Sequence, residues 1–207
     1  MGGRFQVKVI GLTGGIGMGK STAAKALRRA GLPVFDADAT VHALQSPGGA
    51  AMPSIAALVP AAVRNGVLDR AALRRAVVAD PLLLTALERI VHPLVRAAQR
   101  RFLAHARRRG ARFAVLDVPL LLETGGDRNC DLVLVVSAPR ALQLQRVRRR
   151  RGMSEAEARA LIARQMPDQQ KRARADLVLS TGLSRWHSLR QIRRMLARLR
   201  HDREPIR

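Results

Sequence analysis

The feature that most constrains this chain is a glycine-rich stretch near its start, residues 14–21. Its sequence, Gly-Gly-Ile-Gly-Met-Gly-Lys-Ser, matches the pattern Gly-x4-Gly-Lys-[Ser/Thr] without a mismatch. Glycines let successive backbone N–H groups curve around an anion, and a following helix directs its positive end at the same point. The stretch therefore predicts a P-loop, provided that a strand precedes it and a helix follows it.

Both flanks meet this requirement. Residues 7–12 form a short apolar run rich in β-branched side chains, and residues 21–30 are rich in helix formers. The alternative, a glycine turn that merely joins a strand to a helix, explains less of the pattern. We expect nucleotide phosphates to bind at Gly15, Ile16, Gly17, Met18, Gly19, Lys20, Ser21 and Thr22.

Three side chains of this stretch have expected roles. Lys20 is predicted to reach the β- and γ-phosphates. Ser21 offers a hydroxyl oxygen, a hard ligand of the kind that Mg²⁺ prefers. Thr22 is placed to touch phosphate from the next position. A magnesium ion is therefore implied together with the nucleotide.

The composition predicts one compact unit with at most an inserted subdomain, because the chain has 207 residues and 47% of them are hydrophobic. Its formal net charge of +23 either attracts polyanions or reflects a general enrichment in arginine. The second interpretation is favoured, since the arginines are spread along many helical faces. Aromatic residues make up only 2%, which argues against stacking on single-stranded nucleic acid.

The expected location is the cytoplasm. Cys130 is the only cysteine, so no disulfide can form within the chain. Residues 1–6 show no apolar segment of the kind found in signal peptides. The longest weakly polar stretch, residues 50–63, is interrupted by Pro53 and Pro60 and is too short to span a bilayer. We expect neither a membrane nor a specific nucleic acid as partner.

Five short apolar runs read as strands and alternate with helical patterns. This alternation predicts an α/β fold with a five-stranded parallel sheet and helices on both faces. The runs are residues 7–12, 33–35, 113–117, 132–136 and 177–179.

Carboxylates follow two of these strands. Asp36 and Asp38 come at the end of the second run, where ligands bind in open α/β sheets. If the strand persists, both side chains point the same way; alternatively, Asp38 caps a helix over residues 39–45. Asp117 ends the third run in the manner of a Walker B carboxylate and is a candidate partner of Mg²⁺.

Residues 39–109 are almost wholly helical in pattern, with Asp69 and Asp80 as expected helix caps. An apolar face recurs at helical spacing, and His92-Pro93 is predicted to end that helix and begin another. A lone histidine there is more often structural than a ligand contact. The apolar face comprises Leu83, Leu84, Leu87, Ile90 and Val91.

An arginine-rich helical hairpin follows the fourth strand, with Ser154 and Glu157 in a capping-box pattern. Such a hairpin suits a lid that closes over a nucleotide and brings guanidinium groups to its phosphates. Arg146 and Arg150 lie on one face; the other arginines at 148, 149 and 151 are expected to be solvated. A final basic amphipathic helix over residues 186–207 is predicted to pack through Leu189, Ile192, Leu196 and Leu199.

Several segments in succession, and not the P-loop alone, resemble one family, the dephospho-CoA kinases of the coenzyme A pathway. The Thr-Gly-Gly-Ile-Gly form of the loop, combined with Asp-Ala-Asp and His-Pro, is more specific than the P-loop pattern by itself. The resemblance covers residues 8–185. Its segments are residues 11–17 leading into 19–22, then 36–38, 90–93, 118–123, 143–146, Gln165 and 175–176.

The resemblance implies ATP-dependent phosphorylation of the ribose 3′-hydroxyl of dephospho-CoA. It implies a P-loop kinase-like three-layer fold, with a nucleotide-binding core over residues 1–38 and 110–207. The lid is expected at about 140–167 and the CoA-binding helical region at 39–109. A monomer or weak homo-oligomer is expected.

The family's residue roles carry over position by position. The expected catalytic residues are Asp38, as the base for the 3′-hydroxyl, Lys20 and Arg146. The expected nucleotide contacts include Arg150, the substrate contacts are Asp38, His92 and Glu123, and the metal contacts are Ser21 and Asp117.

The chain departs from the family pattern at two places. Met18 replaces a common serine, which is expected to be harmless because only the backbone binds there. Ser180, Thr181 and Gly182 replace an Asn-containing turn, so side-chain recognition of adenine at that turn is not predicted.

Other functions share part of this pattern. Another P-loop small-molecule kinase would lack the Asp-Ala-Asp and His-Pro pairing, and a GTPase should carry an Asn-Lys-x-Asp motif, which the sequence does not contain. A nucleic-acid-binding ATPase would use the positive charge and should bind DNA with a steep salt dependence.

Overall fold

The computed structural model describes residues 6–201. The chain divides into two compact units, and each is described by itself. The first unit contains the chain up to Phe35 and from Ala106 onward, and the second is Asp36–His105. The inserted region expected at residues 39–109 overlaps the second unit; its role in binding CoA stays a prediction.

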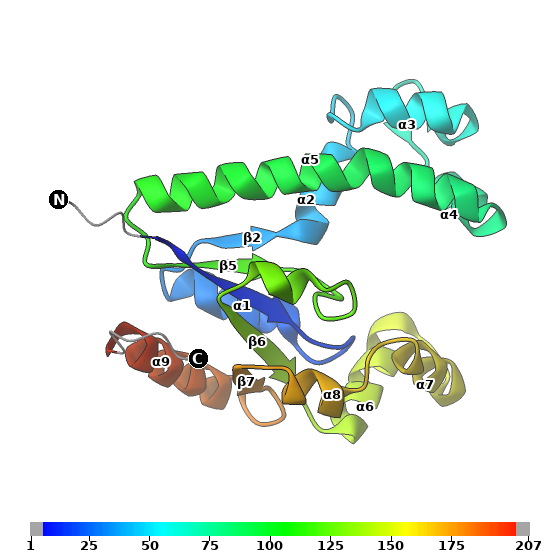
Figure 1. Cartoon of the computed structure of the whole chain (residues 1–207). Helices are drawn as coiled ribbons and strands as arrows, with labels where there is room; N and C mark the ends of the chain where they lie inside the picture. Colours follow the sequence, from blue (N-terminus) through cyan, green and yellow to red (C-terminus); the bar gives the residue numbers. More distant parts are fainter. Residues whose placement is uncertain (1–5, 202–207) are drawn as a thin grey trace. The chain divides into compact units, whose positions relative to one another are not determined.

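A five-stranded sheet forms the centre of the first unit, as predicted (Figure 1). The strand order is β2-β5-β1-β6-β7, and the pairings of β1 with β5, β1 with β6 and β6 with β7 are parallel. Each strand lies within about a residue of its predicted run. Their bounds are β1 (Lys8–Thr13), β2 (Val34–Asp36), β5 (Phe113–Asp117), β6 (Leu132–Ser137) and β7 (Leu177–Ser180).

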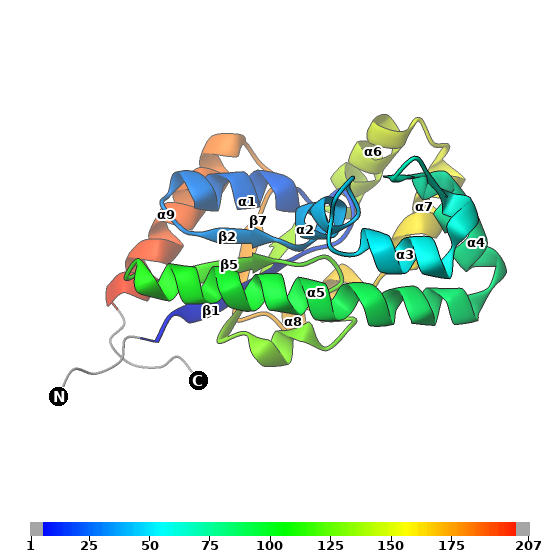
Figure 2. The same cartoon turned by 90° about the horizontal axis from the view of Figure 1, so that it is seen from above.

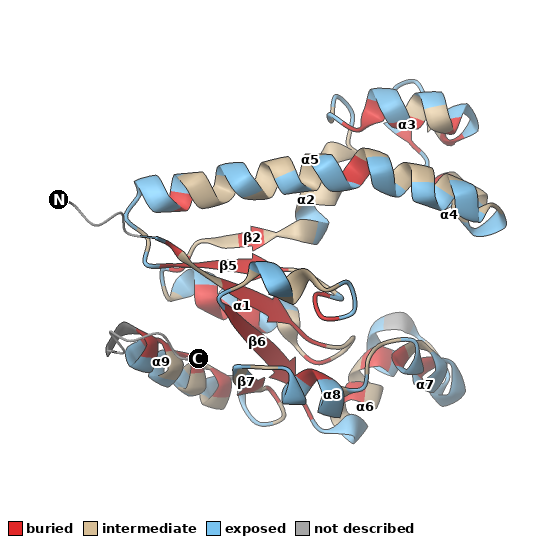
Figure 3. Ribbon diagram, viewed as in Figure 1, coloured by how far each residue is buried: buried red, intermediate tan, exposed pale blue. Residues whose placement is uncertain are grey.

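Helices or loops cover both faces of the sheet, and the strands β5 and β6 are buried along their whole length (Figure 3). Successive side chains of a strand point to opposite faces. Leu134 of β6 packs in one core with Leu27 and Ile192, whereas its neighbour Val135 packs in a second core with Leu122. Strands covered on both sides read as continuous apolar runs, which is why the sequence located them.

Two helices lie side by side on the first of these faces, α1 (Lys20–Arg29) and α9 (Arg185–His201) (Figure 2). In α9, Ile192, Leu196 and Leu199 are buried in the core and Leu189 packs against it, as predicted. The remaining residues of the predicted tail, 202–207, lie outside the described part of the chain. The helix is therefore held by one apolar stripe, while Arg190, Arg193, Arg194 and Arg198 are exposed.

The predicted helical hairpin is present as α6 (Arg140–Arg151) and α7 (Glu155–Ala163). Ser154 is the N-cap of α7 and forms the predicted reciprocal capping box with Glu157. Val147 packs against α7 in a small apolar cluster with Ala158 and Ile162. The short helices η2 (Gly126–Asn129) and α8 (Asp168–Ala173) complete the first unit.

The second unit is mostly helical and also contains a two-stranded antiparallel hairpin that the sequence analysis missed. Asn65 and Gly66 form its turn with φ values of 50° and 73°. Asn-Gly is the strongest short hairpin signal, because both residues tolerate positive φ. The elements are α2 (Ala37–Leu44), α3 (Met52–Leu58), η1 (Pro60–Ala62), β3 (Val63–Arg64), β4 (Val67–Leu68), α4 (Arg70–Ala79) and α5 (Pro81–Arg108).

The core of the second unit is built around Ile55, Leu68 and Leu73. Most of the predicted apolar face of α5 packs on it or is buried, but Leu84 is 44% exposed and does not belong to that face. Asp69 and Asp80 accept backbone hydrogen bonds at the starts of α4 and α5, as predicted. Within residues 6–201, no helix has the length and hydropathy needed to cross a membrane.

The start of α2 differs from the prediction. Asp36, not Asp38, is the N-cap, because its Oδ1 accepts the N–H of Ala39 at 2.9 Å. The strand ends at Asp36, so Asp38 lies in the first turn of the helix and is exposed. The two carboxylates are therefore not consecutive members of one strand face.

The prediction that Pro93 ends a helix is wrong. Helix α5 runs without a break from Pro81 to Arg108. Proline removes one hydrogen bond to the carbonyl four residues earlier and disfavours a helix interior. Here Ile90 and Leu94 on either side pack against the second core, so tertiary burial outweighs the local cost.

Replacing Pro93 by alanine should raise the free energy of unfolding by up to about 3 kcal/mol, since alanine restores a donor for the Arg89 carbonyl. Pro93 is exposed, so little packing is lost. Urea unfolding followed by circular dichroism measures the change. Pro53→Ala is the control: Pro53 lies in the first turn of α3, where no intrahelical bond is missing, and should give no gain. A less stable Pro93→Ala variant would contradict this account.

Candidate active site

The P-loop motif, residues 14–21, joins β1 to α1 as predicted. Gly17 and Gly19 have φ values of 76° and 93°, in the left-handed region that favours glycine. A Cβ on Gly14 would lie 2.7 Å from the carbonyl oxygen of Val136. The glycines are thus required by the curve of the backbone and by its close approach to β6.

Lys20 forms an ion pair with Asp117, with 2.5 Å between Nζ and Oδ1. Asp117 is the last residue of β5 and lies opposite Leu12 in the register with β1. Its side chain is 5% exposed and that of Lys20 is 19% exposed. The pair stands at the carboxyl edge of the sheet, where open α/β folds bind their ligands.

The residues predicted to contact Mg²⁺ fit that ion. Ser21 offers a hydroxyl oxygen in the first turn of α1, and the neighbouring Lys20 contacts the Asp117 carboxylate. Mg²⁺ prefers such oxygens and usually keeps phosphate and water ligands as well. In the described part of the chain no group of three or more His, Cys, Asp or Glu residues could hold a metal. Phosphate oxygens and water would therefore complete the coordination.

Two glutamine side chains bind the backbone N–H and the backbone carbonyl of Ile16. Gln165 Oε1 accepts the Ile16 N–H at 2.8 Å, and Gln143 Nε2 donates to the Ile16 carbonyl at 2.9 Å. In the sequence these glutamines stand out only as parts of the family's motifs. The spacing of Gln143 and Arg146, three residues apart on one face of α6, was the available signal. Both glutamines stabilise the loop from outside it.

Met18 does more than the sequence analysis expected. Its side chain is buried, and its Sδ accepts the backbone N–H of Ala138 at 3.2 Å. Methionine fills irregular gaps and its sulfur is a weak acceptor. Met18 thus adds a contact between the P-loop and the end of β6.

Arg146 is brought to the P-loop by α6. Its guanidinium donates to the carbonyl oxygens of Gly17 and Thr181, at 3.4 Å and 2.8 Å, and to the Thr181 hydroxyl at 3.2 Å. Arg150, one turn later, is exposed. The structure therefore places Arg146 in direct contact with the P-loop, whereas Arg150 is exposed.

The remaining arginines of this helix are mostly solvated. Arg148 and Arg149 are exposed, as predicted, and Arg148 makes only a long ion pair of 3.5 Å with Glu155. The side chain of Arg151 lies outside the described part of the structure. Exposed pairs of this kind contribute little to stability.

Glu123 is paired with Lys171, which the sequence analysis did not single out. Lys171 Nζ lies 2.5 Å from Glu123 Oε1, and the lysine side chain is 1% exposed. Burial acts to raise the pKa of Glu123, but the hydrogen bond and charge of Lys171, helped by the Met166 N–H, hold that pKa below its usual value. A role of Glu123 in binding substrate stays a prediction.

Asp38 and His92 belong to the second unit. Asp38 is exposed in the first turn of α2, and His92 is exposed in the middle of α5. The structure thus brings Lys20, Asp117 and Arg146 together around one loop of the first unit. The predicted substrate contacts Asp38 and His92 are carried by separate helices of the other unit.

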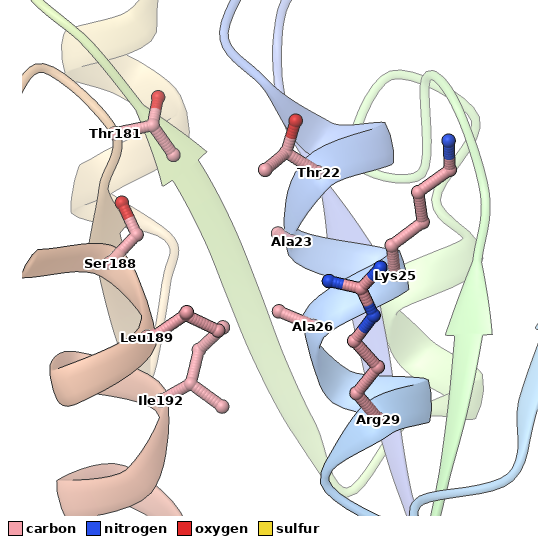
Figure 4. A pocket seen from close by; sticks show the side chains of 9 residues that line it. All are labelled: Thr22, Ala23, Lys25, Ala26, Arg29, Thr181, Ser188, Leu189 and Ile192. Atoms are coloured by element: carbon pink, nitrogen blue, oxygen red, sulfur yellow. The ribbon is translucent and has the colours of Figure 1, made fainter. Parts of the chain in front are cut away.

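Two cavities flank the P-loop region within the first unit. One, of about 260 Å³, lies between α1 and α9 and combines hydroxyls from Thr22, Thr181 and Ser188 with apolar walls (Figure 4). The other, of about 460 Å³, lies between Gly15 and Lys171. Thr22, which follows the P-loop motif, lines the first cavity, and Gly15 and Met18 of the motif line the second.

A family model described as dephospho-CoA kinase matches residues 8–184. The chain is 52% identical over 198 residues to the dephospho-CoA kinase of Gluconobacter oxydans, covering 94% of this chain and 98% of the relative. It is 58% identical over 166 residues to that of Paramagnetospirillum magneticum, covering 80% and 78%. The crystal structure of TT1252 from Thermus thermophilus has a TM-score of 0.80 at 39% identity, covering 94% of this chain and 98% of its own.

Replacing Glu123 by glutamine should destabilise the protein by about 2 kcal/mol at pH 7, because it leaves the buried Lys171 without its counter-charge. The lowered pKa means that the carboxylate stabilises the fold above its ordinary pKa of 4.5 and loses this contribution as pH falls through its folded value. The difference between wild type and variant should therefore shrink in acid. Urea unfolding at pH 7 and at pH 3, well below the ordinary pKa of 4.5, measures it.

The matched control is Glu155→Gln, which breaks an exposed ion pair with Arg159. This variant should leave the unfolding curve nearly unchanged at both pH values, because solvent screens the pair. A Glu123→Gln variant as stable as wild type at pH 7 would show that the Lys171 charge needs no partner.

Proposed function

The chain belongs to the dephospho-CoA kinase family, and on this premise we propose that it transfers the γ-phosphoryl group of ATP to the ribose 3′-hydroxyl of dephospho-CoA. The products are coenzyme A and ADP. The observation that carries the proposal is the P-loop of residues 14–21, braced at the carboxyl edge of the sheet beside the Lys20–Asp117 pair. It is the site for a nucleotide phosphate, and the family match supplies the acceptor.

The phosphates of ATP bind the backbone N–H groups between Gly15 and Thr22, with the N-terminus of α1 aimed at them. Lys20 neutralises charge on the β- and γ-phosphates. Arg146, beside Gly17, provides a second positive charge from the lid. In phosphoryl transfer such groups act mainly by positioning and by electrostatic stabilisation. Arg150 contributes when the lid closes.

Magnesium is part of the proposal. When bound, the ion neutralises the developing charge on the phosphates and holds them in line for transfer. Ser21 would hold the ion through its hydroxyl oxygen, and the Asp117 carboxylate would be the second protein group beside it. Lys20 holds that carboxylate in place through their 2.5 Å contact.

Asp38 acts as the base. It takes the proton from the 3′-hydroxyl as that oxygen bonds to the γ-phosphorus and the bond to the β–γ bridging oxygen breaks, releasing ADP. The carboxylate is exposed and is not occupied with capping α2, since Asp36 does that. His92 and Glu123 contact dephospho-CoA, and the helical region of residues 39–109 binds its CoA moiety.

The protein works in the cytoplasm as a monomer or weak homo-oligomer, without a specific nucleic acid or a membrane. The free thiol of Cys130 suits a reducing compartment. Its pKa is raised to about 11 by burial and by the nearby Asp127 and Asp131, so the thiol is unreactive at neutral pH.

The acceptor is tested by a coupled ADP-release assay on dephospho-CoA, AMP, adenosine and shikimate at equal concentrations, with MgATP. Dephospho-CoA should give the fastest release by at least about tenfold, because only its full set of contacts aligns the hydroxyl. Removing free magnesium with a chelator should abolish ADP release. Faster release with AMP or shikimate would overturn the assignment of the acceptor.

The base is tested by Asp38→Asn, which removes the charge and keeps the shape of the side chain. kcat should fall about a hundredfold or more, the usual effect of a lost general base. The melting temperature and ATP affinity should hold, because the N-cap of α2 is Asp36. Asp36→Asn is the control, since asparagine caps equally well. A loss of kcat in the control instead would identify Asp36 as the base.

A further inference from the structure

The side chain of Thr181 connects the turn between β7 and α9 to the P-loop. Its hydroxyl donates to the Met18 carbonyl oxygen at 2.5 Å, and its backbone N–H donates to the Ser137 carbonyl at 2.8 Å. Thr181 is 6% exposed. A Cβ added to Gly19 would lie 3.0 Å from the Thr181 hydroxyl oxygen, so the two residues pack tightly.

Thr181 also accepts hydrogen bonds from Arg146 of α6. Arg146 donates to the Thr181 hydroxyl at 3.2 Å and to its carbonyl oxygen at 2.8 Å, and also to Gly17 at 3.4 Å. All three acceptors are neutral oxygens. These bonds therefore orient the guanidinium without neutralising its charge, which stays available to an anion.

We propose that Thr181 is a positioning residue that couples Arg146 of the lid to the curve of the P-loop. The proposal rests on the proposed function, in which both Arg146 and the loop act on the phosphates of ATP. It assigns a role to the turn at residues 180–182, where the chain lacks the family's asparagine. Thr181 does not touch the phosphates itself; it acts through the two groups that do.

The chemistry of a hydroxyl suits this coupling. A hydroxyl has one donor hydrogen and two acceptor lone pairs. At Thr181 the hydrogen goes to Met18 and a lone pair accepts from Arg146, so each bond polarises the other. Valine has the same shape as threonine but can neither donate nor accept a hydrogen bond. Serine can do both but lacks the methyl group. The two substitutions therefore separate hydrogen bonding from packing.

The test compares Thr181→Val and Thr181→Ser for ATP affinity by calorimetry and for kcat in the ADP-release assay. Thr181→Val should weaken ATP binding and lower kcat, by about tenfold in kcat/KM for ATP, the scale of one hydrogen bond to a charged group. Thr181→Ser should stay within about threefold of wild type. A Thr181→Val variant with wild-type values of both would overturn the proposal.

A double-mutant comparison separates positioning from simple structural support. In the background of Arg146→Ala, Thr181→Val should lower kcat by much less than it does alone, because its partner is already missing. Additive losses, together with a lower melting temperature for Thr181→Val and Thr181→Ser alike, would mean that the residue only supports the fold.

Ser188→Ala is the matched control. The Ser188 hydroxyl donates to the carbonyl of the neighbouring Ser180 at 3.1 Å, so this variant perturbs the same turn without touching the Thr181 contacts to Met18 or Arg146. Its ATP affinity should stay at the wild-type value, and an equal loss would overturn the special role of Thr181. Calorimetry needs no acceptor, so a failed assignment of dephospho-CoA would appear only in the ADP-release assay.

Discussion

A loop that binds phosphate through its backbone must hold several N–H groups aimed at one point, and glycines cannot hold such a curve by themselves. Each glycine brings conformational freedom that is lost on ordering. The first unit solves this by contacting the loop from several elements at once. Gln143 and Gln165 fix Ile16, the end of β6 lies against Gly14, and Thr181 binds Met18.

These contacts give the α6–α7 hairpin and the β7–α9 turn a role in shaping the P-loop, in addition to their own packing. Both carry side chains that end on the loop, and Arg146 is shared between them. A shift of α6 would therefore change the contacts of Arg146 with both the P-loop and the turn. Arg146 donates to carbonyl and hydroxyl oxygens, which do not neutralise its positive charge. Lys20 and Lys171, in contrast, each form an ion pair with a carboxylate.

Most of the positive side chains behind the net charge of +23 are exposed to solvent rather than paired with carboxylates. Among the described residues Lys171 is the one buried positive side chain, and both Lys171 and the partly enclosed Lys20 form an ion pair with a carboxylate. Most arginines of the lid helix and α9 are exposed to solvent. The positive composition thus says little about the site, where single charges are placed by specific contacts.

The sequence by itself determined the strands, the P-loop, the capping box and the caps at Asp69 and Asp80, because each depends on chemistry within a few residues. Where a local signal conflicted with burial, it failed: Pro93 lies inside a continuous helix. The cap of α2 was misplaced for another reason, since Asp36 and Asp38 can both cap a helix and the strand ends at Asp36. The Asn65-Gly66 hairpin was readable but missed. The tertiary structure alone decided the clamp on Ile16, the Glu123–Lys171 pair and the bond from Thr181 to Met18, whose partners are 163 positions apart. A hydroxyl or amide has no periodicity that reveals a distant partner, so only the packed fold shows which one it meets.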